Sequence, residues 1–142
     1  MKLRLLMLGK TRRPELRAVI DDYVKRIARA MPVEVNEVRD EDAALKRLDA
    51  DRAATALLLD AGGKPQDSGA LAGWLAGQRD RGTREIIFLC GDADGFPEVL
   101  RKRVTQKLSL SPMTYSHELA RVMLAEQLYR ALAILSGSPY PK

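Results

Sequence analysis

The chain has 142 residues, 46% of them hydrophobic and 30% charged, which excludes a disordered chain and fits one soluble domain over residues 1–142. No uninterrupted apolar stretch approaches the roughly 20 residues of a membrane-spanning helix, so we expect no membrane association. Lys and Arg outnumber Asp and Glu by 24 to 19, a net charge of +5 that permits a polyanionic partner such as RNA without requiring one.

The chain opens with a strand, a helix and a second strand. An apolar segment at 3–8 predicts a strand that ends at Gly9. Pro14 opens a helix whose apolar residues recur at spacings of three and four, and Pro32 ends it. A partly alternating segment at 33–38 predicts the second strand.

The middle of the chain repeats this order. A charged segment at 41–52 predicts a helix, and the apolar run 56–59 predicts a strand covered on both faces. The turn residues at 60–63 end this strand. A further helix is expected from about Ser68, a plausible N-cap, to Arg81.

The apolar segment 86–90 is the clearest strand of the chain, and the glycines that bound 91–95 predict a turn directly after it. Cys90 is the only cysteine, so no internal disulfide can form. This is typical of a reducing compartment, and we expect the protein to be cytoplasmic.

The last third predicts a short helix that begins at Pro97, a short strand at 107–110, and a long helix over 117–135 that stops at Gly137. Such alternation of strands and helices is typical of an α/β fold, with a mainly parallel sheet covered by helices on both faces.

The helix at 117–135 is apolar around most of its circumference, and its few polar residues point in several directions. A helix of this kind must be buried on more than one side. One side can pack on the sheet while another meets a second subunit, so we expect a homodimer. A central helix in a monomer is the structural alternative.

Ligands of open parallel sheets bind outside the carboxyl ends of the strands. Three such ends carry Gly, Asp or Ser, at 60–64, 91–95 and 109–115. The turn at 91–95 matches no phosphate-binding glycine motif, and Asp92 and Asp94 would repel phosphate. A nucleoside without phosphate suits this cleft better. The alternative is that these residues only shape tight turns.

Other chemistry is sparse. The single histidine, His117, and the single cysteine are far apart in sequence, so we expect no metal site and no Cys–His pair. Two small clusters of basic residues are candidates for RNA contact or for ordinary solvated surface. They are Lys10, Arg12 and Arg13 in an early loop, and Arg101, Lys102 and Arg103 in a late helix.

The most specific segment is 108–131, which reads LSLSPMTYSHELARVMLAEQLYRA. It closely resembles the C-terminal signature of the RlmH family, SPOUT-class enzymes that methylate N3 of a pseudouridine in 23S (large-subunit) ribosomal RNA of assembled ribosomes. Shorter matches run along the whole chain. They are Met1-Lys2-Leu3, Leu59-Asp60 with Gly63-Lys64, Phe88-Leu89-Cys90-Gly91 and Pro139-Tyr140.

The resemblance implies a SPOUT-type fold with a trefoil knot in the C-terminal part, a homodimer, and S-adenosyl-L-methionine as cofactor. By position, eight residues correspond to the cofactor-binding segments of the family. They are Leu59, Gly91, Leu110, Ser111, Pro112, Met113, Thr114 and Tyr115.

The family's reaction moves a methyl group from a sulfonium to a base nitrogen that must lose its proton, so positioning and a nearby proton acceptor should both contribute. The candidates for catalysis are Tyr140, Arg130 and His117, and those for RNA contact are Arg121, Arg130 and Lys142. Ion pairs along the helix, Arg121 with Glu118 and Arg130 with Glu126, are the structural alternatives.

Two positions depart from the family. Members usually end in Tyr-His and a basic residue, whereas this chain ends in Tyr140-Pro141-Lys142. Proline cannot accept a proton, so any role of that histidine falls elsewhere or is lost. The paired glycine of the family after the fourth strand is here Gly91-Asp92, which puts an acid near the methionine or ribose end of the cofactor.

Several functions therefore stay open at this stage. The first is an rRNA methyltransferase, and the second is a SPOUT enzyme that acts on another RNA such as tRNA. The third is a catalytically silent ribosome-binding member of the family, which the missing histidine keeps open. An unrelated flavin- or nucleotide-binding α/β domain is the most distant alternative.

Overall fold

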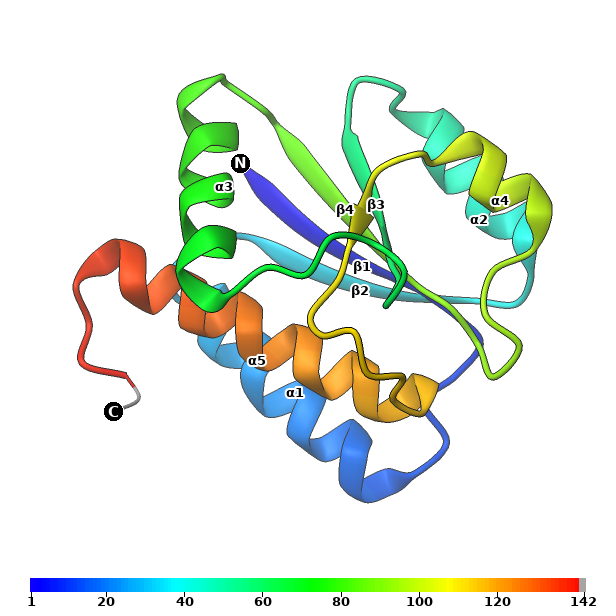
Figure 1. Cartoon of the computed structure of the whole chain (residues 1–142), viewed down its shortest axis with the longest axis horizontal. Helices are drawn as coiled ribbons and strands as arrows, with labels where there is room; N and C mark the ends of the chain where they lie inside the picture. Colours follow the sequence, from blue (N-terminus) through cyan, green and yellow to red (C-terminus); the bar gives the residue numbers. More distant parts are fainter. Residues whose placement is uncertain (141–142) are drawn as a thin grey trace.

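The computed structural model describes residues 1–140 and has one sheet of five parallel strands in the order β2-β1-β4-β3-β5. Figure 1 shows these strands as the centre of the molecule. In chain order the strands are β1 (Lys2–Leu8), β2 (Val33–Val38), β3 (Thr55–Leu59), β4 (Glu85–Cys90) and β5 (Lys107–Leu108). The last of them is shorter than the predicted segment 107–110, because the chain leaves the sheet at Ser109 toward the next loop.

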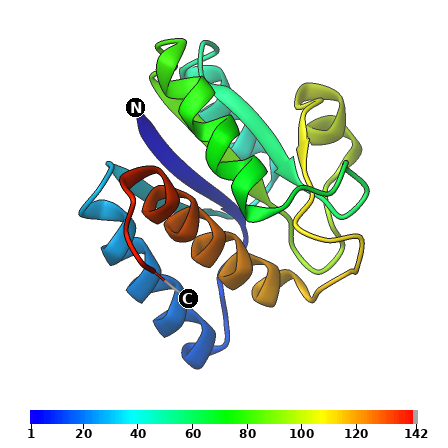
Figure 2. The same ribbon diagram turned by 60° about the vertical axis from the view of Figure 1, so that its left-hand side comes forward.

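Helices cover both faces of the sheet (Figures 1 and 2). They are α1 (Pro14–Ala28), α2 (Glu41–Ala50), α3 (Ser68–Asp80), α4 (Glu98–Arg103) and α5 (His117–Ser136). On one face α5 lies between α1 and α3, and on the other α2 contacts α4. The expected α/β fold with a mainly parallel sheet and helices on both faces is confirmed.

Two apolar cores follow from the alternation of side chains along the strands. In β4, Ile86 and Phe88 face the helices α1, α3 and α5, whereas Ile87 and Leu89 face α2 and α4. Both sets of side chains are buried, as the continuous apolar run in this strand predicts for a strand covered on both faces.

The helix ends follow local chemistry. The carboxylate of Asp40 accepts the backbone N–H of Ala43 at the start of α2. At the start of α3, Asp67 caps the helix by accepting from Ala70, so the predicted N-cap at Ser68 is wrong by one residue. Gly137 ends α5 with a φ of 73°, a left-handed conformation that glycine adopts without strain.

Helix α5 is buried on more than one side, as its sequence predicts. Leu124, Leu128 and Ala131 pack in the core. The opposite side keeps Leu119, Met123 and Ile134 exposed. At 100° per residue these three lie on one stripe with Glu126 and Arg130. We call these five residues, 119, 123, 126, 130 and 134, the outer stripe of α5.

No helix within residues 1–140 combines the length and the apolar character that a membrane span needs.

Candidate functional site

A cavity of about 590 Å³ opens at the carboxyl edge of the sheet. Its wall combines the segments that follow β3, β4 and β5 with the first turn of α5. Seven of the eight predicted cofactor residues line it, and Pro112 alone is absent from the wall. The seven are Leu59, Gly91, Leu110, Ser111, Met113, Thr114 and Tyr115. The structure therefore brings together three loops that lie far apart in the sequence.

The turn after β4 forms one side of the cavity and folds closely on itself. Asp92 and Gly95 are joined by the hydrogen bond from the N–H of Gly95 to the Asp92 carbonyl, at 3.0 Å. A Cβ on Gly91 would lie only 2.8 Å from the carbonyl oxygen of Gly95. The absence of a side chain at Gly91 is therefore a requirement of the turn. The Asp92 carboxylate accepts the N–H of Asp94 at 2.8 Å, so it also shapes the turn.

The loop after β3 is tied to α4 across the cavity. Asp60 accepts hydrogen bonds from the Gly62 N–H and from the Arg101 guanidinium, both at 2.8 Å. The Gly62 N–H, and then Arg101, hold the pKa of the Asp60 carboxyl below its usual value. Arg101 also lies over the ring of Phe96, which lines the cavity too. Sequence reasoning placed Arg101 only in a basic cluster, because no local signal pairs it with Asp60, 41 residues earlier.

The loop after β5 forms the opposite wall. Ser109 is fully buried and donates from its hydroxyl to the Ser111 carbonyl at 3.0 Å. The Ser111 hydroxyl accepts the N–H of Met113 at 3.0 Å, and the Met113 side chain is 71% exposed. The loop is thus ordered by its own serines, and it presents an apolar side chain beside the cavity.

Two further groups at the cavity have definable chemistry. His117, the first residue of α5, lines the cavity, and the preceding Ser116 caps the helix. Cys90 also lines the wall, and burial raises the pKa of its thiol to about 12. The thiol is therefore protonated at neutral pH, which makes Cys90 a poor nucleophile.

Arg121 does not lie where an RNA-binding residue must lie. Its side chain is 0% exposed, and it donates to the carbonyls of Leu8 and Gly9 and to the Thr11 hydroxyl. The prediction that Arg121 contacts RNA directly is therefore wrong. The predicted alternative, a surface ion pair with Glu118, is also wrong, because the guanidinium turns inward to the end of β1.

Arg130 and Tyr140 lie together, away from the cavity. The Tyr140 hydroxyl donates to Glu126 at 3.2 Å and lies 3.2 Å from the Tyr23 hydroxyl. Arg130 pairs with Glu126 at 3.1 Å, as the helix spacing predicts, and lies over the Tyr140 ring. Burial and the hydrogen bond with Tyr23 raise the pKa of Tyr140, so the hydroxyl stays protonated. Lys142, the remaining RNA candidate, lies outside the described residues.

Residues 1–140 contain no group of three or more His, Cys, Asp or Glu side chains arranged to hold a metal ion.

Fold and cavity together define an α/β protein with a cavity of small-molecule size at the carboxyl edge of a parallel sheet. A family model described as a predicted SPOUT methyltransferase matches residues 1–141, and the chain belongs to this family.

Curated relatives match over nearly the whole chain. A protein of Pelobacter propionicus named Ribosomal RNA large subunit methyltransferase H is 42% identical, over 99% of both chains. Proteins of the same name from Koribacter versatilis and Dinoroseobacter shibae are also 42% identical. They cover 99% of this chain and 97% and 98% of the relatives. The resemblance seen in the sequence is thereby confirmed.

Proposed function

We propose that this protein is a methyltransferase that uses S-adenosyl-L-methionine to modify large-subunit ribosomal RNA. The observation that carries the proposal is the cavity, because seven of the eight residues that the resemblance assigns to the cofactor line its wall. The relatives at 42% identity, all named as large-subunit rRNA methyltransferases, support the same substrate.

The residues of the cavity fit the cofactor. Its volume of about 590 Å³ lies within the range of about 300–1,000 Å³ that is typical of small-molecule sites. The wall is mostly apolar, with the backbone of the turn at 91–95 on one side, and no phosphate-binding group is needed. Gly91 lets the turn at 91–95 fold tightly at the cavity wall, because a Cβ there would meet the backbone of Gly95. We infer that the seven wall residues hold the cofactor and that Pro112 shapes the loop between them.

The bound cofactor would supply an electrophilic methyl group on its sulfonium. The contribution of the chain is to hold the target base in line with that methyl group and to accept the proton of the base nitrogen. His117 is the candidate from the same chain, because it lies in the cavity wall. Its Nε2 lies 3.8 Å from the Glu118 carboxylate.

Arg130 and Tyr140 can take part in the reaction only if a second chain brings them to a cavity. Arg130 follows His117 by 13 positions on the same helix, a rise of about 20 Å. Within one chain the two cannot reach the same base. If two copies of α5 run antiparallel, the end of one helix lies beside the start of the other. We infer that Arg130 and Tyr140 act at the cavity of the partner subunit.

The outer stripe of α5 is the surface that we assign to this homodimer. It combines three exposed apolar side chains with Arg130 and Glu126. A twofold interface uses the same surface on both subunits, and the outer stripe suits that arrangement because it runs the length of α5. We also infer that the chain is one domain and forms the trefoil knot of the family. Its substrate would be N3 of a pseudouridine in assembled ribosomes, and its location the cytoplasm.

One alternative has a specific observation in its favour. The family histidine near the C-terminus is Pro141 in this chain, and proline can neither accept nor donate a proton. A silent member of the family would bind the cofactor and the ribosome without turnover.

The test is transfer of labelled methyl from S-adenosylmethionine to intact ribosomes that lack the modification. Separated subunits and bulk tRNA are the controls. We expect label in large-subunit RNA, mapped to one pseudouridine. Label in tRNA alone would show that the substrate is tRNA and not large-subunit ribosomal RNA. Absence of label from every RNA, with a protein that binds the cofactor, would establish the silent member instead.

A further inference from the structure

The loop between β1 and α1, residues 9–13, is held in place by charged side chains of α5. One oxygen of Glu118 accepts the backbone N–H groups of both Arg12 and Arg13, each at 3.0 Å. Arg121 donates to two carbonyls at the end of β1, at 2.6 and 3.1 Å. These contacts join residues more than 100 positions apart in the chain, so the loop is fixed to the first turns of α5.

A third contact fixes the middle of the loop. The carboxylate of Glu37, at the end of β2, accepts the N–H of Thr11 at 2.7 Å, and Thr11 is itself buried. Glu118 is only 7% exposed. The Arg13 N–H, and then that of Arg12, hold the pKa of Glu118 below its usual value. Because a buried carboxylate loses hydration, the hydrogen bonds to the loop must offset that loss. The Glu118 carboxylate is therefore the acceptor that fixes the loop.

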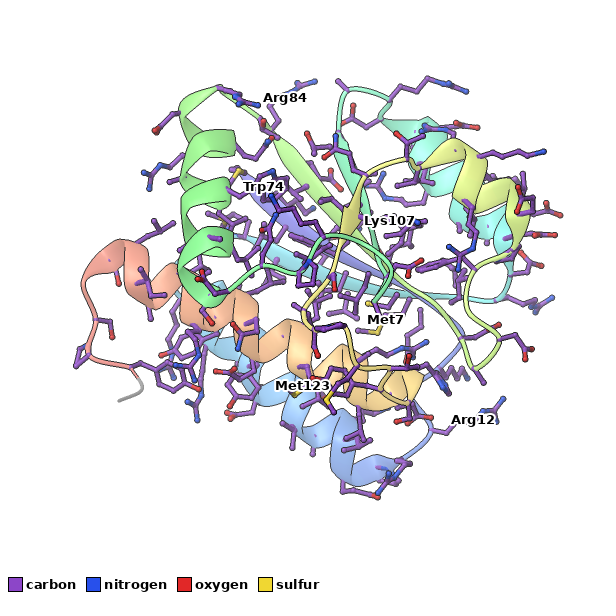
Figure 3. The ribbon with its side chains drawn as sticks, viewed as in Figure 1. Met7, Arg12, Trp74, Arg84, Lys107 and Met123 are labelled. Atoms are coloured by element: carbon purple, nitrogen blue, oxygen red, sulfur yellow. The ribbon has the colours of Figure 1, made fainter. Side chains whose placement is uncertain are left out.

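The fixed loop presents two cations to solvent. Lys10 and Arg12 are exposed, and within residues 1–140 neither makes an ion pair, whereas Arg13 pairs with Glu15 at 2.9 Å. Figure 3 shows Arg12 pointing outward beside the first turn of α5. Exposed cations without a carboxylate partner remain available to an anionic partner.

The loop lies near the cavity through its contact with Glu118, although none of residues 9–13 lines the cavity. His117 and Ala120, which flank Glu118 in α5, both line the cavity. A base that enters the cavity beside His117 and Ala120 would bring its neighbouring phosphates close to this loop. We propose that loop 9–13 binds RNA phosphates beside the target nucleotide through Lys10 and Arg12, with Glu118 as the positioning residue. This inference rests on the proposed function and identifies the surface that places the RNA.

Two physical arguments favour phosphates as the partner. Phosphate contacts from Lys and Arg position a protein on nucleic acid and gain free energy from counterion release. A loop whose backbone is already ordered loses less conformational freedom when it binds. The same cations on a mobile loop would attract RNA without setting the register of the target base.

The first experiment compares two double variants that remove the same charge. K10A/R12A removes the loop cations, and R81A/R84A removes two exposed arginines from the amino edge of the sheet. Figure 3 shows Arg84 at the end of the molecule opposite Arg12. Binding to large ribosomal subunits is measured over a series of salt concentrations. Cofactor affinity is measured for each protein by calorimetry.

We expect K10A/R12A to weaken ribosome binding roughly tenfold and to lower the slope of log affinity against log salt by about 2. Ribosome binding by R81A/R84A should be unchanged. The cofactor affinity of both double variants should also be unchanged. Equal ribosome binding by the two variants would overturn the inference. The proposed function is tested separately, because methyl transfer by the unsubstituted protein decides it whatever the loop variants do.

The second experiment tests Glu118. E118A makes the protein more positive, so electrostatics alone would strengthen RNA binding. If Glu118 orders the loop, E118A should instead weaken ribosome binding and raise the KM for ribosomes. E118Q, which keeps an oxygen that accepts both N–H groups, should restore most of both. Stronger or equal binding by E118A would contradict the positioning role, and melting curves confirm that both variants are folded.

Discussion

Gly91 shows how a single residue decides whether the cavity can form. A side chain there would meet the backbone of Gly95, which cannot move without opening the turn. We therefore expect G91V to abolish cofactor binding, measured by calorimetry with S-adenosylmethionine. G73A, at an open position of α3, is the control. Unchanged cofactor affinity in G91V would refute the placement of the site.

Arg121 stabilises the fold rather than the RNA complex. Its side chain is fully buried, and its loss would leave two carbonyls at the end of β1 without their donors. We expect R121M to lower the free energy of unfolding by about 2–4 kcal/mol, measured with urea. R121K keeps the positive charge, so its free energy of unfolding should fall by less. A change in R121M below about 0.5 kcal/mol, the range of ordinary surface substitutions, would exclude this role.

Glu118 makes stability depend on pH. Its folded pKa lies below the usual value of 4.5, so the ionised form stabilises the folded state. This contribution is complete above the unfolded pKa and is lost as pH falls through the folded pKa. We expect the difference in unfolding free energy between the unsubstituted protein and E118Q to shrink between pH 6 and pH 3. A difference that is constant over this range would show that the pKa of Glu118 is the same in both states.

At the scale of elements, helix α3 offers a matched test of glycine conformation. Gly73, inside the helix, and Gly82, just beyond it with a φ of 81°, both have open space at the Cβ position. We expect G73A to stabilise the protein by about 0.5–1 kcal/mol, because alanine loses less entropy in a helix. G82A should destabilise it, because a side chain is strained at positive φ. Thermal melting measures both, and shifts of the same sign would contradict this account.

Local signals in the sequence predicted most of these elements. The strand at 86–90 and the helix that stops at Gly137 appear in the structure with nearly the predicted bounds. Errors occur where neighbouring residues compete for one role, as when Asp67 rather than Ser68 caps α3. The strand at 107–110 is shorter than predicted because it ends at Leu108, and beyond it Ser109 makes only an isolated parallel bridge with Pro65.

At the scale of the whole molecule, the proposed homodimer makes a direct prediction. M123E places a charge in the middle of the outer stripe of α5, where Met123 is 38% exposed. We expect the unsubstituted protein to be a dimer in light scattering and M123E a monomer, because an unpaired charge is costly in an apolar interface. The monomer should bind the cofactor but transfer no methyl group, since Arg130 and Tyr140 then have no partner cavity.

The control for this prediction is V99E, which changes a similarly exposed apolar residue of α4 on the other face of the sheet. V99E should remain a dimer. A monomeric unsubstituted protein, or a dimeric and active M123E, would contradict both the interface and the shared active site.

Local patterns in the amino-acid sequence were enough to predict the order of strands and helices along the chain, the parallel sheet, the family and the three cavity loops. These features depend on local patterns: the spacing of apolar residues, the glycines that end strands, and one long specific motif. A pattern of this kind is complete within a short stretch of chain.

Which side chains are buried, and what each of them contacts, follows instead from the packing of the folded chain. Arg121 and Arg130 both read as polar positions of one helix, yet one is fully buried at the end of β1 and the other is partly exposed on the outer stripe. The link from Glu118 to the loop at 9–13 was equally hidden. Contacts between residues about 100 positions apart depend on how helices pack across the sheet, and no local pattern records that packing.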